Sequence, residues 1–166
     1  MEGITIRPAS EQDCGRILAL IRELAAYEHM EQDVTATEDI LRASIFQRHM
    51  AGVFVAEADE QVIGYALYCH NFSTFLGREN LYLEDLYVTP AWRGHGIGTG
   101  LICRVARQAV EEGCQRLDWV CLDWNQPSRD FYEKLGAHAM PWWVGYRAEG
   151  EALQELAGIS RERSEE

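Results

Sequence analysis

The sequence predicts a single α/β domain, and three observations lead to this fold class. Stretches in which apolar residues alternate with a period of two are interleaved with stretches in which they recur every three to four residues. The chain has 166 residues, of which 47% are hydrophobic, which suffices for one core but not comfortably for two. A glycine-rich loop also separates a strand pattern from a helix pattern. We therefore assign residues 1–160 to one domain and expect 161–166 to form a flexible tail.

The first half of the chain predicts a strand, two helices and a strand meander. The first strand lies near Thr5, and Ser10 can cap a helix with one apolar face. Thr35 or Thr37 can cap a second, shorter helix that extends to Ile45. Two strands at 51–58 and 61–71 form a hairpin through Asp59-Glu60, and residues 72–80 are expected to form a loop.

The second half continues the same alternation of strands and helices. A strand at 81–89 stops at Pro90, and after the glycine loop a long amphipathic helix ends at Gly113. A buried strand is expected at 116–122, followed by a helix that begins near Asn125 and stops at Gly136. A last strand at 142–147 and a closing helix at 152–157 complete the expected elements.

The glycine-rich loop Arg93-Gly94-His95-Gly96-Ile97-Gly98 is the most informative stretch of the chain. Glycines let the backbone approach a ligand closely, and free N–H groups at the start of the next helix can bind phosphate oxygens. The loop therefore favours a diphosphate site over an ordinary turn. It does not fit a dinucleotide-binding motif, because Thr99 and Leu101 stand where the third glycine is required, and no lysine of a mononucleotide loop follows.

Composition and charge exclude several other functions. The formal net charge of −12 argues against a nucleic-acid partner and weakly favours small cationic ligands, although acidic chains are also simply soluble. Five cysteines and five histidines lack metal-ligand spacing, so we expect no metal site. No apolar run approaches the roughly 20 residues of a membrane span, and no secretory signal is visible. We therefore expect no membrane partner and a cytoplasmic location.

The spacing of Arg93, Gly96 and Gly98 matches the R/Q-x-x-G-x-G/A signature of the GNAT acyl-CoA N-acetyltransferases. Within that superfamily the chain resembles the spermidine/spermine (diamine) and thialysine acetyltransferases over nearly its whole length. The matching residues are Arg7-Pro8-Ala9, Asp13-Cys14, Glu23-Leu24-Ala25, Tyr27-Glu28, Tyr82-Leu83-Glu84-Asp85, Trp124-Asn125, Pro127-Ser128 and Phe131-Tyr132. The resemblance implies the GNAT fold, with a mixed, mostly antiparallel central sheet flanked by helices. It also implies a homodimer, in which Trp142-Trp143 would serve the interface.

The resemblance implies acetyl-CoA as the cosubstrate and indicates where it binds. The pantetheine arm is expected to run beside Leu86, Tyr87 and Val88 as though it were an added strand. The diphosphate is expected at the loop residues Arg93, Gly94, His95, Gly96, Ile97, Gly98 and Thr99. Contacts from the other side are expected from Asn125, Gln126, Pro127, Ser128 and Tyr132.

Acetyl transfer to an amine requires a proton acceptor, because an ammonium with a pKa of about 10.4 has no lone pair for attack. The resemblance implies that Glu84 is the general base, and its apolar neighbours favour a raised pKa, although Glu84 could instead only bind the ammonium by charge. Asp85 alternates to the opposite face and is the weaker candidate. Tyr132 is expected to protonate the departing thiolate; the alternative is a core tyrosine. No nucleophile is paired with a base, which favours direct attack in a ternary complex.

The expected acceptor is a primary amine of a small cation, either a polyamine or diamine or a thialysine-like or lysine-like molecule. The implied substrate-binding residues are Tyr27, Glu28, Glu84, Asp118 and Trp119. Phe75 and an extra residue in the loop at 75–80 depart from the polyamine enzymes, which weakens the case for spermidine in particular. The rival hypothesis is a non-catalytic acyl-CoA sensor or regulatory protein, which would need neither Glu84 nor Tyr132.

Overall fold

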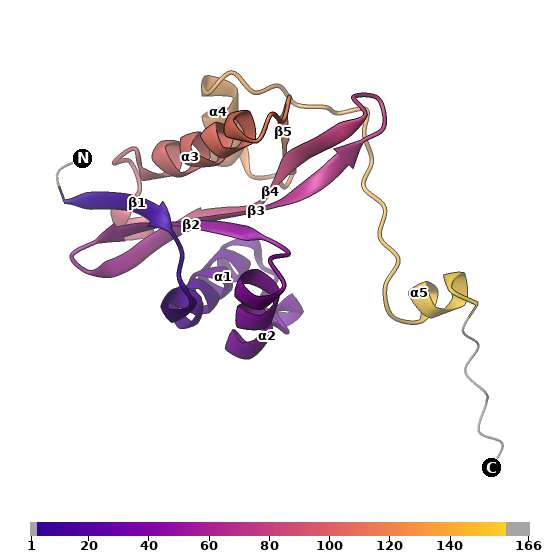
Figure 1. Cartoon of the computed structure of the whole chain (residues 1–166), viewed down its shortest axis with the longest axis horizontal. Coiled ribbons are helices and arrows are strands. Elements are labelled where there is room, and N and C mark those ends of the chain that lie inside the picture. The colour runs from indigo at the N-terminus through magenta and orange to yellow at the C-terminus, as the bar shows by residue number, and fades with distance from the viewer. Residues whose placement is uncertain (1–2, 159–166) are drawn as a thin grey trace, which may run out of the picture. The chain divides into compact units, whose positions relative to one another are not determined.

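A five-stranded sheet forms the centre of the first part of the chain (Figure 1). The computed structural model describes residues 3–158, so the expected tail at 161–166 lies outside the described residues. The strands are β1 (Ile4–Pro8), β2 (Gly52–Ala58), β3 (Gln61–Ser73), β4 (Arg78–Val88) and β5 (Leu117–Asp118), in the spatial order β1-β2-β3-β4-β5. The first four pair antiparallel, whereas β5 pairs with β4 in parallel. The sheet is therefore mixed and mostly antiparallel, as the resemblance implied.

Helices cover both faces of this sheet. The helices α1 (Cys14–Glu28) and α2 (Glu38–Arg42) lie on one face, and α3 (Ile97–Glu111) lies on the other (Figure 1). Short helical turns occur at Glu11–Asp13, Glu31–Asp33 and Pro90–Trp92, and α2 runs into one π-helical turn at Ala43–Gln47. Thr37, one of the two expected caps, accepts the Ile40 N–H at the start of α2.

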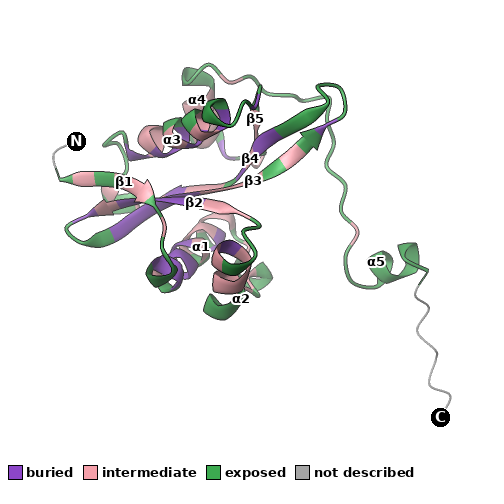
Figure 2. Cartoon of the chain, in the orientation of Figure 1, coloured by how far each residue is buried: buried purple, intermediate pink, exposed green. Residues whose placement is uncertain are grey.

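Burial in the central strands is continuous rather than alternating: residues 53–56 of β2 and 62–66 of β3 are all buried, so both faces of the sheet contribute to a core (Figure 2). Ile17 and Leu20 of α1 pack in one buried cluster with Val55 and Tyr65 of the sheet and with Tyr87 of β4. On the other face, the buried side of α3 consists of Ile97, Leu101, Ile102, Val105 and Ala109. The long central strands are thus covered on both sides, which makes them a rigid base for the residues at their ends.

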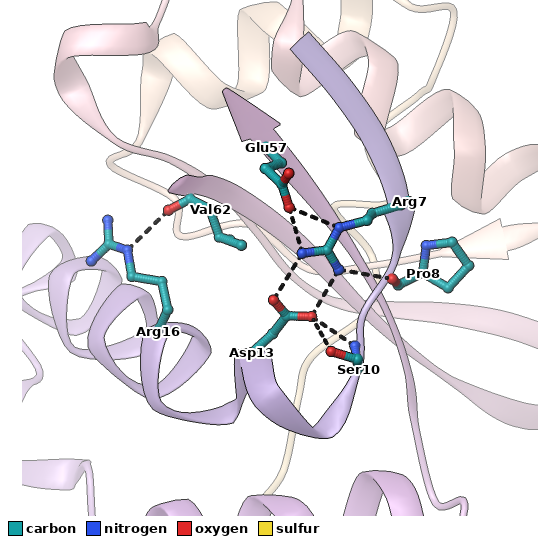
Figure 3. A network of polar contacts seen from close by, with 7 residues as sticks. All are labelled: Arg7, Pro8, Ser10, Asp13, Arg16, Glu57 and Val62. Atoms are coloured by element: carbon teal, nitrogen blue, oxygen red, sulfur yellow. Dashed lines mark hydrogen bonds and ion pairs between the residues drawn. The ribbon is translucent and has the colours of Figure 1, made fainter. Parts of the chain in front are cut away.

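A compact ion-pair network joins β1, β2 and the start of α1 (Figure 3). The Arg7 guanidinium donates to both carboxylate oxygens of Asp13, at 2.8 and 2.9 Å, and to Glu57 at 2.6 Å. Asp13 also accepts from the Ser10 N–H at 2.7 Å, which closes the turn before the helix. The hydrogen bonds from Arg7 outweigh burial and lower the pKa of Asp13 to about 2. The network therefore fixes where α1 begins.

Residues 121–158 form a second compact unit. It contains α4 (Gln126–Lys134) and α5 (Gly150–Leu156). The predicted strand at 142–147 is wrong, because residues 143–149 have no regular structure. Trp142 is 70% exposed and Tyr146 is 95% exposed. A strand pattern alone does not make a strand, because its backbone groups need a neighbouring strand to pair with.

Two further expectations differ from the structure. Residues 72–80 do not form a loop, because β3 and β4 continue as a hairpin in which Phe72 pairs with Glu79 and Ser73 with Arg78. The strand expected at 116–122 is reduced to the two residues of β5, which pair with Leu81 and Tyr82. The segment 72–80 pairs with itself across the turn, whereas the length of β5 is set by a partner strand that lies elsewhere in the sequence.

Candidate active site

A β-bulge interrupts β4 at Glu84. Leu67 of β3 pairs with Asp85 and the next residue, Tyr68, pairs with Leu83, so Glu84 is the extra residue and has no partner on β3. Such bulges re-aim side chains and often occur beside active sites. Glu84 is exposed, whereas the flanking Leu83 is only 2% exposed. The expected proton acceptor therefore lies at the irregular point of the strand, and it is open to solvent rather than enclosed by the neighbouring leucines.

Beyond the bulge, one edge of β4 has no neighbouring strand in the described part of the chain. The parallel pairing with β5 includes only Leu81 and Tyr82, so Leu86, Tyr87 and Val88 pair with β3 alone among the described strands. An extended ligand with amide groups can pair with such an edge as a further strand does. The arm of an acyl-CoA carries such amides, and this edge is where the sequence predicted it.

The glycine loop leads directly into α3. Gly94 and Gly96 have φ angles of 79° and 77°, which side chains rarely tolerate, and a Cβ at Gly94 would meet no atom within 4 Å. The Gly96 carbonyl accepts the Gly100 N–H at 2.9 Å, so the helical hydrogen bonds begin there. The N–H groups of Ile97, Gly98 and Thr99 therefore precede the first donor of the helical ladder and remain available to an anion. The open space and these donors fit the diphosphate of acetyl-CoA.

Arg93 and His95 make their own contacts in this loop. The Arg93 Nε donates to the Val88 carbonyl at 3.0 Å, and its guanidinium lies over the rings of Tyr27 and Tyr87. His95 Nδ1 lies 2.9 Å from the Arg93 carbonyl oxygen. The contacts of Arg93 thus tie the loop to β4 and to the last turn of α1.

Two carboxyl groups occupy the α1 face beside the bulge. Asp85 accepts a hydrogen bond from the buried Tyr65 hydroxyl at 2.9 Å, and Glu28 ends α1. Burial raises the pKa of Asp85, although the Tyr65 hydrogen bond opposes the rise, and the charge of Glu84 adds to it. Burial, together with the charge of Asp85, raises the pKa of Glu28. No arginine or lysine among residues 3–158 forms an ion pair with either group.

Two negative charges held close together without an arginine or lysine partner among residues 3–158 favour a positively charged ligand. The resemblance predicted Tyr27 and Glu28 as residues that bind the cationic substrate, but Asp85 was considered only as the weaker candidate for the general base. Strand alternation separates Asp85 from Glu84 but does not show that α1 brings Glu28 to the same face. The signal available in the sequence was the pair of adjacent acids, Glu84 and Asp85, within the predicted strand at 81–89.

The remaining predicted substrate residues, Asp118 and Trp119, lie at the end of β5 and directly after it. Asp118 forms an ion pair with Arg116 at 3.0 Å between carboxylate oxygen and Nε, and both are partly exposed. Trp119 is half-buried. A carboxylate that already has a cation partner is a weaker site for an amine than Glu28 and Asp85.

In the second unit, α4 carries the predicted residues Asn125, Gln126, Pro127, Ser128 and Tyr132. The buried Asn125 side chain accepts the Ser128 N–H at 3.3 Å and so caps the helix, while Pro127 occupies its first turn. Gln126 donates to Asp130 at 2.6 Å. Tyr132 is half-buried, and its ring centroid lies 5.2 Å from that of Phe131. The cap and the proline together fix where α4 begins, one residue after Asn125 as predicted.

A mixed sheet with a bulged β4, an open strand edge and a glycine loop before a helix N-terminus defines a class, the acyl-CoA-dependent N-acyltransferases. Comparison with known proteins agrees with this class. The chain belongs to the Acetyltransferase (GNAT) family, whose model matches residues 16–137. The fold class predicted from the sequence is thereby confirmed.

Individual relatives extend this result over nearly the whole chain. A thialysine N-epsilon-acetyltransferase of Bos taurus is 44% identical over 95% of this chain and 99% of its own length. Spermidine/spermine N(1)-acetyltransferase-like protein 1 of Homo sapiens is 33% identical over 95% of this chain, which corresponds to 24% of the human protein. Among solved structures, an integron cassette protein from the mobile metagenome of V. cholerae has a TM-score of 0.78 and 30% identity, and it covers 95% of this chain and 99% of its own.

The protein is therefore an enzyme, an acetyl-CoA-dependent amine N-acetyltransferase. The predicted cosubstrate and enzyme class are confirmed, and the relatives give no support to a non-catalytic sensor. In the described part of the chain no helix is long and apolar enough to cross a membrane, and no cluster of potential metal ligands occurs.

Proposed function

We propose that the enzyme acetylates a primary amine of a small cation of the thialysine or polyamine type. The observation that carries this proposal is the pair Glu28 and Asp85, two partly desolvated carboxyl groups that form no ion pair with an arginine or lysine among residues 3–158. They hold a second, non-reacting ammonium group of the acceptor by charge. The relatives that act on thialysine support the same substrate class.

The chemistry assigned to the site is direct attack on the thioester in a ternary complex. Glu84 accepts the proton that the ammonium must lose, because the bulge presents it at the open edge of β4. The amine nitrogen then attacks the thioester carbonyl carbon, the C–S bond breaks, and Tyr132 donates a proton to the departing thiolate, while the second proton that the nitrogen loses restores the Tyr132 hydroxyl. The N–H groups at the start of α3 hold the diphosphate.

Assembly and location follow as further parts of the proposal. The exposed aromatic residues Trp142, Trp143 and Tyr146 support a homodimer that buries them, since exposed apolar patches mark interaction surfaces. The enzyme works in the cytoplasm, where acetyl-CoA and small amines are both available.

The role of Glu28 can be tested with matched acceptors that differ in one ammonium group. Putrescine carries two amines, whereas 1-aminobutane has the same chain length and one. We expect Glu28→Gln to raise KM for putrescine at least tenfold, with release of coenzyme A as the assay, and to leave the weaker activity on 1-aminobutane within twofold. The same assay with thialysine, lysine and spermidine identifies the preferred acceptor. Equal effects on both matched amines would contradict a site for the distal ammonium.

The catalytic roles predict a different kinetic pattern. We expect Glu84→Gln and Tyr132→Phe each to lower kcat at least a hundredfold while the Kd for acetyl-CoA stays within threefold of wild type. Calorimetric titration with acetyl-CoA and steady-state rates with the best acceptor give both quantities. Normal turnover in both variants would overturn the assigned roles.

A further inference from the structure

Arg93 is the most fully engaged side chain of the glycine loop, and its contacts lead away from α3. The centre of its guanidinium lies 5.1 Å from the Tyr27 ring centroid and 5.4 Å from the Tyr87 ring centroid. Its Nε donates to the Val88 carbonyl at 3.0 Å. One hydrogen bond and two aromatic rings therefore fix the plane of the group.

These contacts lie on the face of the sheet that α1 covers. Tyr87 belongs to the buried cluster that α1 contributes to, and Tyr27 lies in the last turn of α1. The N–H groups that can hold a diphosphate belong to α3, which packs on the opposite face (Figure 1). Tyr87 also interacts through its hydroxyl with Glu23 of α1 and with Arg93. Arg93 therefore joins the loop to the α1 layer.

Tyr27 is adjacent to Glu28, the residue to which the proposed function assigns the distal ammonium. The contact of the Arg93 guanidinium with the Tyr27 ring restricts the last turn of α1. It therefore also restricts the position of the Glu28 carboxylate near Asp85. We propose that Arg93 is a positioning residue for the amine site, not a ligand of the diphosphate. This inference rests on the proposed function, because it concerns the same acceptor.

The two roles predict opposite responses to the acyl donor. A diphosphate ligand matters for acetyl-CoA but not for S-acetyl-pantetheine, which carries the same thioester without a diphosphate. A positioning residue for the amine matters equally with both donors. We expect Arg93→Gln to raise KM for the best acceptor at least tenfold with either donor, and to change the Kd for acetyl-CoA less than threefold.

Conservative variants distinguish the contact between Arg93 and the Tyr27 ring from an effect of the positive charge alone and from an effect on folding. Arg93→Lys keeps the charge but loses the planar group, so we expect it to behave like Arg93→Gln. Tyr27→Leu removes one ring and should reproduce the KM defect, whereas Tyr27→Phe keeps the ring and should restore KM to within threefold of wild type. The two variants Tyr27→Leu and Tyr27→Phe still test the inference if the Arg93 variants fold poorly.

Two outcomes would overturn the inference. One is a tenfold weaker Kd for acetyl-CoA in Arg93→Gln together with an unchanged KM for the amine when S-acetyl-pantetheine is the donor. The other is an unchanged KM for the amine in both Arg93→Gln and Tyr27→Leu. Failure of the proposed function is distinguishable, because it would show as the absence of amine-dependent thiol release in the wild-type enzyme.

Discussion

Two groups of carboxylates in this molecule have pKa values that are shifted in opposite directions. Asp13 and Glu57 share Arg7, and the pKa of Asp13 falls to about 2 as a result. Glu28 and Asp85 have no arginine or lysine partner among residues 3–158, burial raises the pKa of both, and the charge of Asp85 adds to the rise at Glu28. The first group holds β1, β2 and α1 together. The second leaves negative charge without an arginine or lysine partner among residues 3–158, and this is the basis of the proposed amine site.

Among the predictions, replacing Arg7, the cation that Asp13 and Glu57 share, should have the largest effect on the free energy of unfolding. Arg7→Met leaves Asp13, whose side chain is 9% exposed, and the nearby Glu57 without their partner. We expect the free energy of unfolding to fall by about 3 kcal/mol, at the lower end for buried ion pairs because Arg7 keeps some solvent contact. Urea unfolding measures this quantity. The matched control is Arg42→Met, which breaks exposed pairs with Glu38 and Asp39 and should leave stability close to wild type.

Acid titration should reveal the Asp13 ion pair in the wild-type protein. The pKa of Asp13 is lower in the folded state than its ordinary value of 3.8, so its contribution is complete above about pH 4. The contribution, about 2 kcal/mol, is lost as pH falls from about 4 to about 2. We expect the difference in unfolding free energy between wild type and Asp13→Asn to shrink over this range. A difference that is constant with pH would contradict the assignment.

The smallest expected effect on stability concerns Glu28. Its dependence on pH is opposite to that of Asp13. The folded state raises the pKa of Glu28, so its stabilising contribution belongs to the protonated form and is lost as pH rises through that pKa. We expect Glu28→Gln to leave stability at pH 7 unchanged or slightly higher, while the KM for a diamine rises. Urea unfolding at pH 7 and at pH 4 tests this. A clear loss of stability at pH 7 would show that Glu28 is a structural residue.

Some parts of the fold and of the candidate site could be predicted from the sequence, and others could not. Local patterns predicted α1, α3 and the glycine loop, because the period of apolar residues and the glycine positions are properties of short segments. The bulge at Glu84 could not be predicted in this way, because it results from the register between β3 and β4. The proximity of Asp85 to Glu28 depends on how α1 packs against the sheet. The strand expected at 142–147 was wrong because its pairing partner is not encoded locally.

The short pairing of β5 with β4 has a consequence for the resting enzyme. Because β5 pairs only with Leu81 and Tyr82, the backbone of β4 from Asp85 to Val88 is paired on its β3 side alone among the described strands. Unmatched strand edges are templates on which other chains can add and aggregate. A donor bound along this edge, as proposed, would also shield it, so we expect acetyl-CoA to improve the solubility of the protein. Storage of the purified protein with coenzyme A should accordingly delay its precipitation.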